Sequence, residues 1–388
     1  MKLAKRISEV EPSVTLAITA QAKEMKAAGV KVIDFGAGEP DFDSCSCARE
    51  AAIQAINSGF TKYTPVAGIE ELKAAIRDKF KKDNGLDYGL DQIVVSCGAK
   101  HSIFNIVQVL CEEGDEVIIP SPYWVSYPAI VKLAGARPVI AKTETGNNFK
   151  LEEKALSSLI TARTRAIILN SPANPTGSVY QKKELEKISD IAARHNIFII
   201  SDEIYEKIVY DDSRHISIAS LNKKSYQSTI VVNGVSKAYS MTGWRIGYLA
   251  APPEVARAVA TFQGHSTSNP ASISQKAALG ALKGGEQFIR DMQKEFGKRR
   301  DCVLSGLQKI DILSFNKPQG AFYLFCNISK LGMDSVSFSR QLLNQEKVAL
   351  TPGIAFGDDR YVRISFAANM DDIKEGVERI ARFVKSKL

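Results

Sequence analysis

Lys237 and Asp202 are the two residues whose types and surroundings point most directly to chemistry. Lys237 stands between Ser236 and Ala238, and such small neighbours in an apolar stretch favour a lowered lysine pKa and Schiff-base formation with a carbonyl compound. Asp202 precedes Tyr205, so a carboxylate and a phenol could meet one bound ring. A buried carboxylate needs a positive partner, which a protonated ring nitrogen would supply. A single lysine is far more often an exposed surface residue, so the interpretation depends on the other positions.

Two segments indicate phosphate binding. Gly98, Ala99 and Lys100 follow an apolar run and open a helical stretch, where small residues let backbone N–H groups approach an anion. Arg245 follows Lys237 in the same polar segment and is available to a phosphate. Glycine is common in turns between strands and helices, so this signal is weak when taken alone.

Asn174 lies in a segment that favours a fixed backbone. Pro172, Pro175 and Gly177 surround it and would hold its side-chain amide rigidly. The same residues are equally typical of a simple turn. Asn174 is therefore a candidate for a binding role only in combination with the residues above.

The elements that must position these side chains follow from the hydrophobic pattern. Short Val- and Ile-rich runs alternate with amphipathic stretches, which is typical of parallel strands joined by crossover helices. In such sheets ligands bind beyond the carboxyl ends of the strands, where the residues above lie. The expected strands are 93–96, 116–120, 137–141, 166–170, 198–201, 229–233 and 247–250. The expected helices are 16–28, a crossover over 185–192, a long charged helix through 298–300 and a terminal helix capped by Asn369.

Composition indicates a folded protein with two domains. A chain of 388 residues exceeds what one hydrophobic core usually holds. The net charge of +8 comes from Lys and Arg interleaved with Glu and Asp, which does not favour a nucleic-acid partner. No apolar run has the length of a signal peptide or a membrane span, so we expect a cytoplasmic protein without a membrane partner. The six cysteines lack the spacing of a metal site or disulfide scaffold, and we expect reduced thiols and no bound metal.

Taken together with 38–42 (Gly-Glu-Pro-Asp-Phe) and 361–365 (Tyr-Val-Arg-Ile-Ser), these motifs and their order resemble a known family. It is that of the fold-type I aminotransferases that depend on pyridoxal 5′-phosphate (PLP), close to the prokaryotic subgroup of aspartate aminotransferases. The resemblance covers nearly the whole chain. It implies an α/β fold with a large PLP-binding domain at 47–289, whose mainly parallel sheet carries helices on both faces. A smaller α/β domain would be formed by 1–46 and 290–388.

The resemblance also implies a role for each cofactor-binding position. Lys237 would form the Schiff base with PLP and later move a proton, and Asp202 would pair with the ring nitrogen. Asn174 and Tyr205 would bind the phenolic oxygen, and Trp124 would stack on the ring, although a tryptophan is often a packing residue. The implied phosphate ligands are Gly98, Ala99, Lys100, Ser236 and Arg245, with Tyr63 of a second subunit.

For the substrate, the resemblance implies that Arg363 clamps the α-carboxylate, with help from Gly38 and Asn174. Because Tyr63 would reach the partner's phosphate, the active sites would be shared in a homodimer. The implied substrate-binding residues are Gly38, Asn174, Arg363, Lys100, Thr15 and Trp124.

One departure concerns the distal carboxylate of a dicarboxylic substrate. Animal-type relatives hold it with an arginine of the partner subunit, but the comparable segment here, 264–270, contains none. In the prokaryotic subgroup the lysine matching Lys100 serves instead, helped by a residue at Thr15. Glu11 stands where a basic residue is frequent, which leaves the identity of larger acidic substrates open.

The predicted function is amino transfer between an L-amino acid and a 2-oxo acid, with aspartate and 2-oxoglutarate as the first choice. Aromatic or prephenate amino transfer is the nearest alternative, followed by a PLP-dependent lyase. A PLP-binding transcription regulator is the alternative outside enzymes. It would need an additional DNA-binding segment, whereas the catalytic motifs here begin near the first residue.

Overall fold

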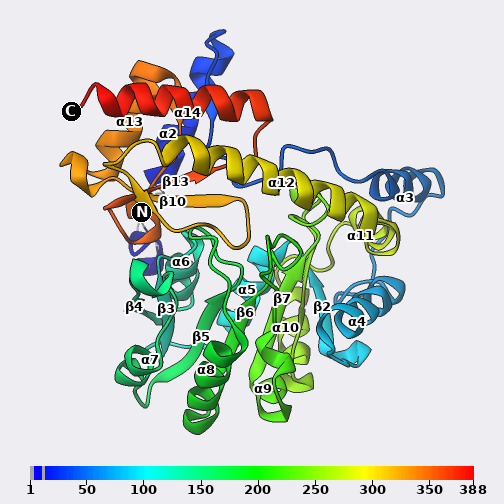
Figure 1. Ribbon diagram of the computed structural model, residues 1–388. Coiled ribbons are helices and arrows are strands. Elements are labelled where there is room, and N and C mark those ends of the chain that lie inside the picture. The colour runs from blue at the N-terminus through cyan, green and yellow to red at the C-terminus, as the bar shows by residue number, and fades with distance from the viewer. Residues whose placement is uncertain (1–3, 11–13) are drawn as a thin grey trace.

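A seven-stranded sheet forms the centre of the molecule (Figure 1). The computed structural model describes residues 4–10 and 14–388, without the side chains of residues 5, 14–17 and 19. The strand order is β2-β8-β7-β6-β5-β3-β4. The strands are β2 (Ile93–Ser96), β3 (Glu116–Ser121), β4 (Arg137–Lys142), β5 (Thr164–Asn170), β6 (Phe198–Asp202), β7 (Thr229–Gly234) and β8 (Gly247–Ala250). All seven predicted strands are present, and none differs from its predicted bounds by more than two residues at either end.

Strand direction explains why residues from distant segments meet. Six strands run parallel, whereas β8 runs antiparallel to both neighbours, β2 and β7. The carboxyl ends of the parallel strands therefore lie at one edge of the sheet. Because β8 begins at that same edge, the residues just before it join those that follow β2, β5, β6 and β7.

Helices cover both faces of this sheet, as the sequence predicts. Ile199 packs with the side chains of α8, whereas its neighbour Ile200 packs with those of α5 and α6, because successive strand residues point to opposite faces. Both residues are fully buried. The helices of this unit are α3 (Ser46–Asn57), α4 (Glu70–Asn84), α5 (Ala99–Leu110), α6 (Ser126–Leu133), α7 (Glu153–Leu159), α8 (Lys182–His195), α9 (Lys223–Ser228), α10 (Pro253–Gly264) and α11 (Ser272–Gly284).

A second, smaller sheet lies above the carboxyl edge of the large one (Figure 1). Its order is β12-β13-β10-β9, with β9 (Ser314–Phe315), β10 (Tyr323–Asn327), β12 (Thr351–Pro352) and β13 (Tyr361–Ser365). Near it, β1 (Ile33–Asp34) pairs in parallel with β11 (Val348–Ala349), so a segment from the first part of the chain lies beside one from the last part. The remaining helices are α1 (Lys5–Ser8), α2 (Val14–Ala27), α12 (Glu286–Leu307), α13 (Ser335–Glu346) and α14 (Met370–Lys385). Asn369 caps α14 by accepting the amide of Asp372 at 2.8 Å.

The long charged helix predicted through 298–300 is α12, and it buries two of its charged side chains. Arg299 and Arg300 are only 6% and 2% exposed. Arg299 pairs with Asp41 at 2.6 Å, and Arg300 with Asp211 at 2.9 Å. These ion pairs join α12 to two loops, and the periodicity of the helix alone did not indicate their partners.

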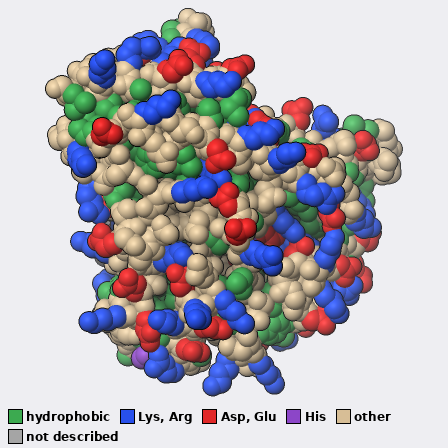
Figure 2. Space-filling model, viewed as in Figure 1, with side chains coloured by type: hydrophobic (Ala, Val, Ile, Leu, Met, Phe, Trp, Pro, Cys, Tyr) green, Lys and Arg blue, Asp and Glu red, His purple; other side chains and the backbone are tan. Residues whose placement is uncertain are grey.

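Charges on the visible surface alternate in sign (Figure 2). The described part of the chain contains no helix long and apolar enough to cross a membrane. The six cysteines are free thiols, and the sulfurs of Cys45 and Cys47 lie 3.2 Å apart. Glu203, Glu206 and His215 could together hold a metal ion, but Lys79 already pairs with Glu206 and His215 with Glu203.

Candidate active site

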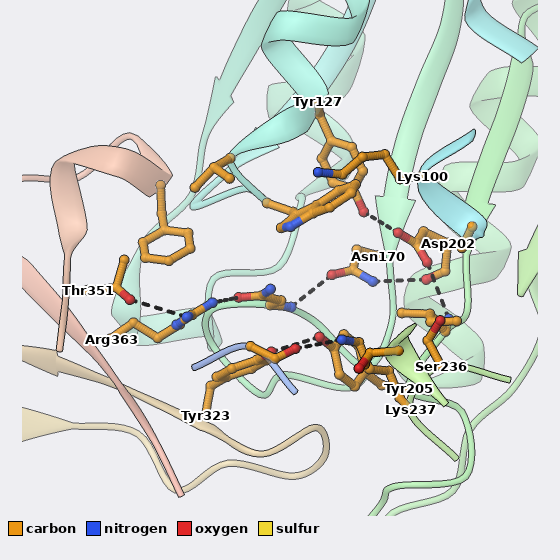
Figure 3. Close-up of a pocket in the computed structure, with 18 of the residues that line it drawn as sticks. Lys100, Tyr127, Asn170, Asp202, Tyr205, Ser236, Lys237, Tyr323, Thr351 and Arg363 are labelled. Carbon is orange, nitrogen blue, oxygen red and sulfur yellow. Dashed lines mark hydrogen bonds between the residues drawn. The ribbon is translucent and has the colours of Figure 1, made fainter. Parts of the chain in front are cut away.

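A cavity of about 450 Å³ opens between the carboxyl edge of the large sheet and the small sheet (Figure 3). Residues predicted to bind PLP or substrate make up half of its lining. They are Gly38, Ala99, Lys100, Trp124, Asn174, Asp202, Tyr205, Ser236, Lys237, Arg245 and Arg363. Gly98 does not line the cavity, but it is the N-cap residue of α5 and directly precedes Ala99, which does. The structure thus brings these positions together, although their individual roles stay predictions.

Asp202 is a buried carboxylate at the end of β6, only 4% exposed. The hydroxyl of Tyr127 donates to Oδ2 at 2.6 Å, and the amide of Ile204 donates to Oδ1 at 3.3 Å. Burial nevertheless raises the pKa of Asp202 to about 6, because both hydrogen bonds offset only part of the desolvation. A positively charged ligand group beside Asp202 would restore its ordinary acidity.

Lys237 follows β7, and its Nζ donates to the carbonyl oxygen of Gly38 at 2.5 Å. Burial lowers the pKa of Lys237 to about 8, and Arg363 and Arg245 add to this effect while Glu39 opposes it. An amine with this pKa is partly neutral near pH 8, as a nucleophile or proton acceptor must be.

Gly98 and Arg245 form a cradle for an anion at the start of α5. Gly98 is the N-cap of α5 and has φ of 92°, a conformation that glycine adopts easily. A Cβ there would also collide with the guanidinium of Arg245. Arg245 donates to the carbonyl oxygen of Thr242 at 2.9 Å and to that of Cys97 at 3.3 Å. Positive charge, a helix N-terminus and free space together suit a phosphate.

Arg363, on β13, is a buried guanidinium whose hydrogen-bonding capacity is only partly used. Its Nη1 donates to Oδ1 of Asn174 at 3.1 Å, and its Nη2 to the carbonyl oxygen of Gly36 at 2.7 Å and the hydroxyl of Thr351 at 3.2 Å. Nε has no partner in the described part of the chain, and no carboxylate there pairs with Arg363. Phe356 and Tyr323 stack against its plane. An anionic ligand would complete this site.

Lys100 and Trp124 form the wall of the cavity that faces α6. The Nζ of Lys100 lies 5.0 Å from the centre of the Trp124 ring. Burial lowers the pKa of Lys100, and the charge of Arg245 adds to the effect. Lys100 would gain more from an acidic ligand than a fully solvated lysine does, because it has already lost part of its hydration.

Several residues of the cavity were missed by the sequence analysis. Asn170 donates to the carbonyl oxygen of Asp202 at 2.9 Å and accepts the amide of Asn174 at 2.8 Å, so it fixes both. It ends β5, a position that the strand-end rule could have identified. The other lining residues that were missed are Gly36, Val125, Tyr127, Ile204, Thr242, Tyr323, Thr351 and Phe356.

Two predicted residues are not placed in the cavity. Tyr63 is 91% exposed and does not line it, as expected if its role lies in a second subunit. The side chain of Thr15 and the whole of Glu11 lie outside the described part of the chain, and their predicted roles stay untested.

The cavity combines a lysine with a lowered pKa, a buried carboxylate and two arginines, an arrangement that suits the chemistry of a transaminase. The chain matches the family model of aminotransferase class I and II over residues 30–380 and belongs to that family. It is therefore an aminotransferase with the aspartate aminotransferase fold, and the family implies PLP as cofactor.

Similar proteins carry more particular names. The aspartate aminotransferase of Bacillus subtilis (strain 168) is 47% identical, with 99% of each chain covered. A probable aspartate/prephenate aminotransferase of Rickettsia typhi is also 47% identical, with 97% of each covered. The crystal structure of the aspartate aminotransferase from Rhizobium meliloti has a TM-score of 0.95 at 42% identity, covering 99% of both chains. That of Thermus thermophilus with maleate has a TM-score of 0.95 at 39% identity, covering 98% of this chain and 99% of that one.

Proposed function

We propose that the enzyme moves the amino group of L-aspartate to 2-oxoglutarate, in two half-reactions carried out by PLP in this cavity. The observation that carries the proposal is the joint placement of Lys237, Asp202 and Arg363 around one space. Each of the three needs a complement: an aldehyde, a cationic ring nitrogen and a carboxylate. PLP and an amino acid together supply all three.

The residues of the cavity fit PLP. Asp202 would face the ring nitrogen, and its pKa of about 6 reflects a buried position that gains from a positive charge. Asn174 and Tyr205 would bind the phenolic oxygen, and Trp124 would lie on the ring. The proposed phosphate ligands are Gly98, Ala99, Lys100, Ser236 and Arg245. When bound, PLP withdraws electrons from the Cα–H bond of the amino acid.

Three side chains have separate roles in the proposed amino transfer. Arg363 orients the α-carboxylate through its unused N–H groups. Lys237, partly neutral near pH 8, would take the proton from Cα and deliver it to the carbon atom on the other side of the amino nitrogen, the former aldehyde carbon of the cofactor. Asp202 keeps the ring nitrogen protonated throughout.

The direct test of the reaction is a single half-reaction. The enzyme loaded with PLP is mixed with one amino acid at a time, and the loss of visible absorbance is followed. We expect aspartate and glutamate to react fastest, with release of the 2-oxo acid and without ammonia. Release of ammonia in place of keto acid would identify a lyase and contradict the proposal.

Relatives named for both aspartate and prephenate favour a second acceptor. Prephenate also carries a distal carboxylate, for which Lys100 is the available cation. Amino transfer from aspartate to prephenate is therefore the second candidate, and the same assay with prephenate as acceptor tests it.

Replacing Lys100 by alanine tests dicarboxylate specificity. Without this cation, a distal carboxylate in a partly desolvated pocket loses a charge-assisted partner. We expect kcat/KM for aspartate and glutamate to fall about 10- to 150-fold, corresponding to roughly 1.5 to 3 kcal/mol. Phenylalanine and alanine lack this group and should lose much less.

The comparison of donors is made at saturating PLP on one enzyme preparation. Lys182→Ala is the matched control, because the side chain of Lys182 is 65% exposed on α8 and distant from the cavity. An equal loss for all four donors would show that Lys100 serves only the cofactor phosphate. The main argument for aspartate as the substrate would then be lost.

We also propose a homodimer with shared active sites. Tyr63 is 91% exposed, and Ile53 and Ile56 on the preceding helix α3 are 57% and 54% exposed. An exposed tyrosine beside exposed isoleucines suits a subunit interface, which we expect to bury roughly 2,000 Å² or more.

Tyr63→Phe tests the shared site. If Tyr63 donates to the partner's phosphate, the variant should bind PLP about tenfold more weakly while remaining dimeric in sedimentation. Tyr226→Phe, which alters a hydroxyl on the large unit away from the cavity, is the control. A fully active monomer at assay concentration would contradict the proposal.

The division into domains and the location stay predictions. The pairing of β1 with β11 and of Arg299 with Asp41 supports a small domain built from 1–46 and 290–388. On the face shown in Figure 2, Lys and Arg side chains are interspersed with Asp and Glu, which does not favour DNA binding or a transcription regulator.

A further inference from the structure

We propose that Tyr323 is a positioning residue that directs the proton of Tyr205 toward the phenolic oxygen of the cofactor. The inference rests on the proposed function, because it concerns PLP in the cavity described above. Tyr323 has no part in the sequence motifs. Its hydroxyl nevertheless lies where the cofactor-binding and substrate-binding residues meet (Figure 3).

The two phenols form an isolated buried pair. Their hydroxyl oxygens lie 2.9 Å apart, and the residues are 4% and 0% exposed. Neither hydroxyl has another hydrogen-bond partner in residues 4–10 and 14–388. The rings meet edge to face at 82°, with centroids 5.8 Å apart. Packing therefore holds the pair in one geometry, but either oxygen could be the donor.

A bound cofactor would decide which phenol donates. Tyr205 has one proton, and an ionised phenolic oxygen is a stronger acceptor than the neutral hydroxyl of Tyr323. If Tyr205 donates to the cofactor, its own oxygen is free to accept, and Tyr323 is the donor within reach. Hydrogen bonds in such a chain polarise one another, so donation by Tyr323 strengthens donation by Tyr205.

The surroundings of Tyr323 suit a donor. The guanidinium of Arg363 lies 4.3 Å from the centre of the Tyr323 ring. Burial raises the pKa of Tyr323, while Arg363 and the bond to Tyr205 offset part of this rise. The pKa of Tyr205 lies well above its usual range, through burial and through Tyr323. The positive charge of Arg363 thus favours a polarised O–H bond on Tyr323, which suits a hydrogen-bond donor.

The backbone of Gly38 lies near the hydroxyl of Tyr323. Tyr323 begins β10, whose pairing with β13 places Phe325 opposite Arg363. A Cβ on Gly38 would lie 3.4 Å from the Tyr323 hydroxyl oxygen, so the backbone of Gly38 passes close to it. The carbonyl oxygen of Gly38 also accepts from Lys237. Tyr323 is therefore in contact with residues that hold substrate, cofactor and the proton carrier.

The test is the pH titration of the visible absorption band of the enzyme with bound PLP. Donation to the phenolic oxygen favours the form in which that oxygen carries full negative charge. Tyr323→Phe should weaken this donation and move the titration midpoint up by about 0.3 to 0.7 pH units. Tyr205→Phe, which removes the direct donor, should move it further, by about 1 to 2 units.

Two controls separate positioning from packing. Tyr361→Phe also removes a buried hydroxyl bond, to Thr145 at 2.6 Å, but Tyr361 does not line the cavity, so its midpoint should not move. In a Tyr205→Phe background, adding Tyr323→Phe should cause no further shift, because the chain is already broken. KM for the amino acid should stay within about twofold in Tyr323→Phe.

The outcomes distinguish this inference from the proposed function. If the wild type incubated with PLP shows no visible absorption band, both fail, and if the band is present but does not titrate, the inference alone fails. If the wild type titrates but Tyr323→Phe leaves the midpoint unchanged, the inference alone fails. If Tyr323→Phe leaves the midpoint unchanged but raises KM, Tyr323 is a substrate contact and the inference fails. If Tyr323→Phe adds a further shift to that of Tyr205→Phe, Tyr323 acts independently of Tyr205 and the inference also fails.

Discussion

Lys237→Ala is expected to reduce amino transfer by about 10⁴-fold, because the variant loses both the nucleophile and the proton carrier of the cavity. PLP should still bind, held by the phosphate cradle at Gly98 and Arg245 and by Asp202. Even after treatment with borohydride, the cofactor should be released from the variant by gel filtration in denaturant, since the variant has no imine to Lys237 that could be reduced.

The measurement combines kinetics with chemical labelling. Borohydride reduction of the wild type with PLP, followed by peptide mapping, should label Lys237, and Lys100→Ala should keep that label. The covalent capture of PLP by the cofactor-free enzyme should accelerate with pH around 8, where the amine of Lys237 becomes neutral. A label on Lys100, the other lysine that lines the cavity, would refute the assignment.

Much of the fold follows from local pattern. Strands β2 and β8 begin and end at their predicted residues, because runs of Val, Ile and Leu between polar segments leave few alternatives. The reversed direction of β8 was not predictable in this way. Direction depends on how the chain returns to the sheet, and a strand buried on both faces has the same composition in either direction.

In the candidate site, too, some residues could be predicted from local sequence pattern and others could not. Residues that follow strands, such as Asp202 and Asn174, could be predicted because the carboxyl edge of a parallel sheet is a known location for ligands. Tyr127 and Tyr323 could not, because a buried tyrosine in a helix or strand looks like a packing residue. Their partners lie 75 and 118 positions away in the sequence, and only folding brings the hydroxyls within hydrogen-bonding distance.

Asp202→Asn is expected to have opposite effects on activity and on stability. Asparagine cannot neutralise a protonated ring nitrogen, so kcat should fall about 10²- to 10⁴-fold, as when one partner of a buried ion pair is removed. Without cofactor, however, the ionised carboxylate of Asp202 destabilises the folded protein, because it is buried without a positive partner. Its pKa of about 6 in the folded state exceeds its usual value of 3.8, so folding favours the protonated form.

The sign of the pH dependence follows from this shift. The stabilising contribution of Asp202 to the cofactor-free protein is fully present below about pH 4 and is lost as the pH rises through 6. At pH 8 the buried charge costs roughly 2 to 3 kcal/mol of unfolding free energy, whereas at pH 4, close to the usual pKa, the cost is small. Urea unfolding of the cofactor-free Asp202→Asn variant should therefore show a gain at pH 8 and little change at pH 4. Asp212→Asn, at an exposed position, should show neither effect. An equal effect of Asp202→Asn at both pH values would mean that Asp202 is already compensated within the protein, and the need for a cationic ring beside it would disappear.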